Sequence, residues 1–80
     1  MAVHVKQSYS VVTFATTTQA LAMEHRARQL QIPGRIIPTP AAITATCGLC
    51  WGVVGGDEEE VRRLLEANAI SYEGIRQVML

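Results

Sequence analysis

Apolar positions recur along the chain with two different periods, and together they predict six elements. Residues 8–15 are rich in β-branched and aromatic side chains, which is typical of a buried strand. Residues 19–31 have apolar side chains at helical spacing, with Glu24 and Arg28 one turn apart on the solvent side. Pro33 and Gly34 end this helix, and residues 35–38 form a short strand that Pro38 terminates.

The second half of the chain has the same alternation of strand and helix. Residues 48–55 predict a third strand, whose two faces are Leu49, Trp51 and Val53 on one side and Gly48, Cys50 and Gly52 on the other. Asp57 and Glu60 form a capping-box-like pair at the start of a second helix, which ends near Asn68. Its predicted buried stripe is Val61, Leu64 and Leu65. Residues 72–80 predict a final strand.

The order strand, helix, strand, strand, helix, strand predicts a single α+β domain over residues 1–80, with residues 1–7 as an N-terminal tail. Right-handed crossovers would put both helices on the same face of the sheet. The simplest closure is the ferredoxin-like βαββαβ fold, a four-stranded antiparallel sheet with two helices on one face. Its other face would be partly bare, which favours a homodimer or partner docking there.

Composition and charge exclude several classes of protein. Hydrophobic residues make up 49% of the chain and charged residues 18%, which is a globular composition. Seven basic residues balance seven acidic ones, which argues against nucleic-acid binding. No apolar run is long enough to cross a membrane or to form a signal peptide, so we expect a cytoplasmic protein whose thiols stay reduced.

Cys47 is the main candidate for chemistry. It lies where a long connection of proline, threonine and alanine residues meets the third strand, and Gly48 beside it leaves space. A thiol in such a place can be exposed, as a reactive thiolate must be. Arg35 and Arg76, both in predicted strands, would favour the thiolate if they lay nearby. The alternative is a cysteine that packs as a small hydrophobe.

Cys50 completes a CxxC spacing with Cys47, and three interpretations of that spacing must be separated. A thioredoxin-like pair lies at a helix N-terminus, whereas this one leads into a strand. A disulfide needs α-carbons within about 7 Å, but three extended steps separate them by about 10 Å. A zinc site needs four ligands, and His4 and His25 have no metal-ligand spacing to the pair. We therefore expect no metal and no cofactor, and a packing role for Cys50 competes evenly with a chemical one.

Beyond these patterns, the chain resembles the putative Se/S carrier protein-like family. The resemblance covers residues from about Tyr9 to the end, and the matching positions are Phe14, Ala20, Glu24, Pro38 to Pro40, Cys47 and Gly48. It implies that Cys47 accepts sulfur or selenium and passes it from a donor protein to an acceptor protein. The chain would then be a carrier rather than a true enzyme. Pro38, Pro40, Thr46 and Gly48 would support the thiol.

One departure and two alternative functions accompany this resemblance. Family members usually have an arginine, and often an acidic residue, after the second proline, where this chain has Ala41 and Ala42. An arginine there would help to activate the thiol or to hold an anionic substrate.

The alternatives to a carrier are a soft-metal module that uses the CxxC pair, and an interaction domain in which Cys47 merely packs. A buried, unreactive Cys47 would favour the interaction domain.

Overall fold

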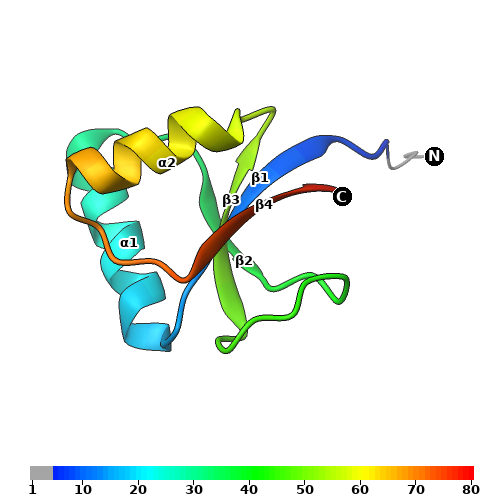
Figure 1. Cartoon of the computed structure of the whole chain (residues 1–80), viewed down its shortest axis with the longest axis horizontal. Helices are drawn as coiled ribbons and strands as arrows, with labels where there is room; N and C mark the ends of the chain where they lie inside the picture. The colour runs from blue at the N-terminus through cyan, green and yellow to red at the C-terminus, as the bar shows by residue number, and fades with distance from the viewer. Residues whose placement is uncertain (1–4) are drawn as a thin grey trace.

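The computed structural model describes residues 5–80 and confirms the predicted fold. The six elements are β1 (Ser8–Thr13), α1 (Thr17–Leu30), β2 (Arg35–Pro38), β3 (Leu49–Val54), α2 (Glu58–Ala67) and β4 (Gly74–Met79). Both helices lie on the same side of the sheet (Figure 1). Gln7, which the sequence analysis placed in a tail, exchanges two backbone hydrogen bonds with Leu80 and so continues the pairing of the first and last strands.

The sheet has the strand order β2-β3-β1-β4, and every neighbouring pair is antiparallel. This is the order of a ferredoxin-like βαββαβ domain. β1 and β3 are central, and the residues Val11 and Val12 in β1 are fully buried on opposite faces of the sheet. Two hydrophobic clusters result, one on each face.

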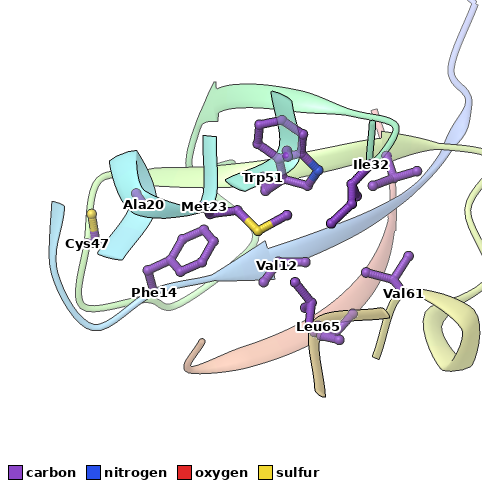
Figure 2. Packing of buried hydrophobic residues seen from close by; sticks show 12 residues of the cluster. Val12, Phe14, Ala20, Met23, Ile32, Cys47, Trp51, Val61 and Leu65 are labelled. Carbon is purple, nitrogen blue, oxygen red and sulfur yellow. The ribbon is translucent and has the colours of Figure 1, made fainter. Parts of the chain in front are cut away.

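The larger cluster lies between the sheet and the helices, and we call it the helix-side cluster (Figure 2). Its buried members are Val12, Phe14, Ala20, Met23, Ala27, Ile32, Cys47, Trp51, Val53, Val61, Leu65 and Ile75. In α2 the predicted stripe is correct for two positions and wrong for Leu64, which is 39% exposed. Leu65 and Val61, one turn apart, are the residues of α2 that are buried in this cluster.

Side-chain caps fix where both helices begin. The hydroxyl of Thr16 accepts a hydrogen bond from the N–H of Gln19 at 3.1 Å, so α1 starts at Thr17, two residues before the predicted start. Asp57 caps α2, but its carboxylate accepts from the N–H of Glu59 at 2.8 Å rather than from Glu60 as a capping box would require. Because Thr16 caps α1, the first turn of this helix follows closely on the end of β1, and the candidate site lies there.

The second face of the sheet is partly covered by the connection between β2 and β3, residues 39–48, which we call the β2–β3 loop. In Figure 1 this loop lies on the side of the sheet away from the helices. Ile43, at 6% exposure, packs there with Val11 and Cys50. We call this group the loop-side cluster; Tyr9, Ile37, Ala45, Val78 and Leu80 pack around it. The face that the sequence analysis expected to be partly bare therefore has a small core of its own.

The turn between α1 and β2 depends on Gly34. Its backbone φ is +120°, a conformation that side chains strongly disfavour. A β-carbon built on Gly34 would meet Trp51 and the carbonyl oxygen of Gly52 at less than 3 Å. The Trp51 indole N–H also donates a 3.0 Å hydrogen bond to the carbonyl oxygen of Pro33. The turn and the largest ring of the helix-side cluster thus fit together only if position 34 has no side chain.

Candidate functional site

Cys47 lies at the end of the β2–β3 loop and packs at one edge of the helix-side cluster. Figure 2 shows it beside Ala20 and Phe14, at the end of the cluster opposite Val61. Cys47 is only 6% exposed. Its position in the loop suggested that the thiol can be exposed, but the structure shows it buried. The apolar neighbours shield the sulfur from solvent, and any reaction with another protein requires a local movement that uncovers it.

Two polar groups lie within hydrogen-bond distance of the Cys47 sulfur. The backbone N–H of Leu49 points to Sγ at 3.4 Å, and the hydroxyl of Thr17 lies 3.6 Å from it. Thr17 is the first residue of α1, where the helix has its partial positive charge. The sulfur therefore lies beside one backbone N–H and one hydroxyl, at the N-terminus of α1. The CxxC motif itself leads into a strand and begins no helix. The helix N-terminus beside Cys47 belongs to α1, 30 residues earlier in the chain.

The segment around Cys47 is held by residues on both sides. Thr39 binds it twice, because its N–H donates to the carbonyl oxygen of Gly48 and its hydroxyl donates to that of Cys47, both at 2.9 Å. On the other side, Glu73 accepts from the hydroxyl of Thr46 at 2.7 Å and from its N–H at 3.4 Å. Nothing in the sequence marked Glu73, since it precedes β4 and meets the loop only in the fold.

The predicted supporting residues have different positions around this segment. Thr46 and Gly48 flank the thiol, and a β-carbon at Gly48 would have no atom within 4 Å, so this glycine faces open space. Pro38 is the last residue of β2 and pairs with Leu49. Pro40 accepts a backbone hydrogen bond from Ile43 at 2.9 Å and so shapes the loop rather than touching the sulfur.

Cys50 lies in the loop-side cluster, on the other face of the sheet from Cys47. It is fully buried, and its thiol donates to the carbonyl oxygen of Ile37 at 3.6 Å. Burial raises the pKa of Cys50, the hydroxyl of Thr39 opposes that change, and charge on Cys47 would add to it. Cys50 therefore stays a neutral, packed thiol at neutral pH.

Because the two thiols belong to separate clusters, the geometry does not support one ion or one disulfide shared between them. Both cysteines are free. Within residues 5–80 no three histidine, cysteine, aspartate or glutamate side chains gather as a metal would need. The soft-metal hypothesis therefore has no donor set among the described residues.

The raised pKa of Cys50 predicts a loss of stability at alkaline pH. The pKa of Cys50 is higher in the folded protein than in the unfolded chain, where a cysteine has a pKa of about 8.5. Such a group stabilises the fold at pH values below the unfolded pKa, and this stabilisation is lost as the pH rises through the folded pKa. We expect the free energy of unfolding, measured with urea from pH 7 to 10, to fall more steeply in the wild type than in Cys50→Ala. Equal slopes would contradict the assignment.

The remaining candidates do not reach Cys47. Arg35 pairs with Gly52 and Arg76 pairs with Val11. Both arginines therefore share the sheet face of the loop-side cluster, away from Cys47, and the suggestion that they favour its thiolate is wrong. His25 is exposed on α1, and His4 lies outside the described residues.

These features define a class of protein, a small ferredoxin-like domain with one thiol set against the N-terminus of its first helix. The family described as Putative Se/S carrier protein-like matches residues 9–77, and the chain belongs to that family. No curated protein and no solved structure matches the chain. Ala41 and Ala42 are exposed on the loop, so this departure from the family pattern changes the loop surface and not the packing of Cys47.

Neither helix in the described part of the chain has the length and apolar character that crossing a bilayer requires.

Proposed function

We propose that this protein carries sulfur or selenium on Cys47, as a persulfide or selenopersulfide, and delivers it to an acceptor protein. The observation that supports the proposal is the position of Sγ, 3.4 Å from the N–H of Leu49 and 3.6 Å from the hydroxyl of Thr17 in the first turn of α1. Both groups can form a hydrogen bond with the sulfur atom at which a thiol attacks and a persulfide transfers. Family membership supports the same function.

The chemistry is two successive displacements at sulfur. The Cys47 thiolate attacks the outer sulfur of a donor persulfide; a bond forms between Cys47 and that sulfur, the donor's S–S bond breaks, and the donor leaves as a thiolate. A nucleophile of the acceptor then attacks the outer sulfur on Cys47, which leaves as a thiolate again. One sulfur atom moves in each step, and neither step needs an outside oxidant or reductant. Selenium would transfer in the same way.

Access to the thiol is the step that this fold must control. Cys47 is 6% exposed at rest, and the residue before it, Thr46, is tied to the segment before β4 by two hydrogen bonds to Glu73. Breaking those bonds would free Thr46 and the loop before it. The hydrogen bonds from Thr39 to the carbonyl oxygens of Cys47 and Gly48 would still hold the two ends of the β2–β3 loop together. A donor protein that competes for Glu73 or Thr46 would thus expose the sulfur only when docked.

Removing the Glu73 side chain should expose Cys47 more often. In Glu73→Ala the loop loses two hydrogen bonds to a carboxylate, and we expect Cys47 to react with iodoacetamide about three to ten times faster in the folded protein. Mass spectrometry of the alkylated peptide measures the rate. Glu66→Ala is the matched control, because that exposed carboxylate bonds Tyr72 and not the loop. An unchanged rate in Glu73→Ala would contradict the role of Glu73.

The first test of the carrier function is the intact mass of the reduced wild-type protein after incubation with a persulfide-generating donor. We expect one added sulfur atom, located on Cys47 by peptide mapping and removed by a thiol acceptor. A protein that gains no sulfur, even when Glu73→Ala has exposed the thiol, would contradict the proposal. A donor that carries a selenopersulfide, used in a parallel sample, tests whether selenium transfers by the same displacement as sulfur.

The burial of Cys47 favours a second candidate function, an interaction domain in which this thiol only packs. The two functions differ in the reactivity of the folded protein. A packing cysteine would alkylate at the rate of global unfolding, whereas a carrier thiol would alkylate faster, through local opening of the loop.

Partners and location follow from the carrier proposal. A carrier needs a donor protein and an acceptor protein, and we propose that it works in the cytoplasm, where thiols stay reduced. A homodimer through the sheet face beside the β2–β3 loop remains a prediction, and sedimentation velocity over a range of concentrations tests it.

A further inference from the structure

A small pocket opens between α1 and the segment that joins α2 to β4. Its volume is about 250 Å³, and it is lined by Thr18, Gln19, Ala22, Arg26, Ala69, Ile70 and Ser71. Thr18, Ala22 and Arg26 are spaced four residues apart, so they follow one stripe along α1. The opposite wall is the backbone turn at Ala69, whose φ of +53° is unusual for a residue other than glycine.

Arg26 is the charged residue of this pocket, and its hydrogen bonding is incomplete. A guanidinium has five N–H donors, yet the contact found for Arg26 is one long hydrogen bond, 3.4 Å, to the carbonyl oxygen of Asn68. Its Nε is buried without an acceptor. The ion pairs found among residues 5–80 use Arg28 and Arg62, so no carboxylate of the described chain neutralises Arg26.

We propose that this pocket binds a small organic carboxylate, with Arg26 as the charged contact. A carboxylate would supply the acceptors and the negative charge that the guanidinium lacks, in the planar geometry that arginine matches best. The hydroxyls of Thr18 and Ser71 are further polar groups in the lining, and Ala22 and Ile70 offer apolar surface to a short carbon chain. The first turn of α1 adds a favourable potential for an anion.

The size and charge of the pocket decide between ligand classes. Its volume of about 250 Å³ is below the range of about 300–1,000 Å³ that is typical of pockets for drug-sized ligands. One guanidinium is the only charge in the lining, so a singly charged carboxylate is balanced, whereas a phosphate dianion would lack a second cation. The apolar part of the wall likewise favours an organic acid over an inorganic oxyanion.

This site is independent of the carrier proposal. Thr17 contacts the Cys47 sulfur and Thr18 lines the pocket, so the two sites use neighbouring residues of α1 but different faces of the helix. The pocket would bind its ligand whether or not Cys47 transfers sulfur. Failure of one proposal therefore says nothing about the other.

The test is an NMR titration of the isotope-labelled full chain with sodium propionate at constant ionic strength, with propionamide as the neutral probe of the same shape. We expect saturable shifts at millimolar propionate for the amides of Thr18, Gln19 and Ser71, and none with propionamide. Arg26→Gln should weaken propionate binding at least about tenfold, because it removes the charged hydrogen bonds. Arg28→Gln, on the exposed side of α1, should bind like the wild type.

A second variant covers the case in which Arg26→Gln fails to fold. Ala22→Leu fills the pocket with a good helix-forming residue and leaves Arg26 in place, and we expect it to abolish the propionate shifts. Equal shifts with propionamide, or full binding by either pocket variant, would overturn the proposal. Tighter, Arg26-dependent binding of inorganic phosphate would overturn the choice of a carboxylate.

Discussion

Cys47→Ser is expected to lose sulfur loading almost completely, on the order of a hundredfold or more, while Cys50→Ser loads like the wild type. The hydroxyl of serine stays protonated at neutral pH, so the nucleophile is lost although the N–H of Leu49 and the hydroxyl of Thr17 remain. Cys50 is fully buried in the other cluster and its pKa is raised, so it offers no substitute thiolate. Intact-mass measurement after incubation with the persulfide donor compares the three proteins.

The comparison needs both serine variants in their folded state. The serine hydroxyl at position 50 can donate to the carbonyl oxygen of Ile37 as the thiol does, so Cys50→Ser should keep the fold, which circular dichroism checks. Loading that persists in Cys47→Ser and disappears in Cys50→Ser would move the reactive thiol to the loop-side cluster. Equal loading of both variants would point to non-specific sulfur uptake.

Gly34→Ala should be the most damaging glycine-to-alanine substitution among the described residues. It forces a side chain into a φ of +120° and places a β-carbon against the indole nitrogen of Trp51 and 2.8 Å from the carbonyl oxygen of Gly52. Strain and overpacking together should cost about 3 kcal/mol or more. In an 80-residue domain this corresponds to a fall in melting temperature of about 12–24 °C, which calorimetry measures.

Gly48→Ala is the matched control for this substitution. An added β-carbon there has no atom within 4 Å, and the backbone φ is not positive, so we expect a change within about 0.5 kcal/mol. Because Gly48 is next to Cys47, the control also shows whether a methyl group added beside the thiol changes the stability of the protein. A stable Gly34→Ala protein would show that the turn after α1 can rearrange and that Trp51 has room to move.

Local patterns were sufficient to predict the fold. The alternation in β3 correctly separated Trp51 and Val53 from Cys50, because successive strand residues point to opposite faces. Element ends differed by one or two residues where caps decided them, as at Thr16. The predicted stripe of α2 also included Leu64, but the helix buries Val61 and Leu65, and Leu64 is exposed.

The candidate site was only half predictable, because its decisive contacts join distant parts of the chain. Cys47 was identified from its place in the loop, but its burial and its contact with Thr17 depend on how α1 crosses the sheet. Glu73 is 27 residues from Thr46 and carried no local signal. Ile43 did carry one, since a lone large apolar residue in a loop of proline, alanine and threonine indicates a buried contact.

The β2–β3 loop takes part in both cores at once: Ile43 packs on the loop-side cluster and Cys47 packs in the helix-side cluster, four residues later. A displacement that lifts the whole loop would uncover a thiol and an apolar sheet face in the same event. A partner that binds the uncovered face would hold the reactive form open, and its departure would close it. Cys47 would then react only while a partner is bound. In the free protein the closed loop would protect the Cys47 sulfur from oxidants and from competing thiols.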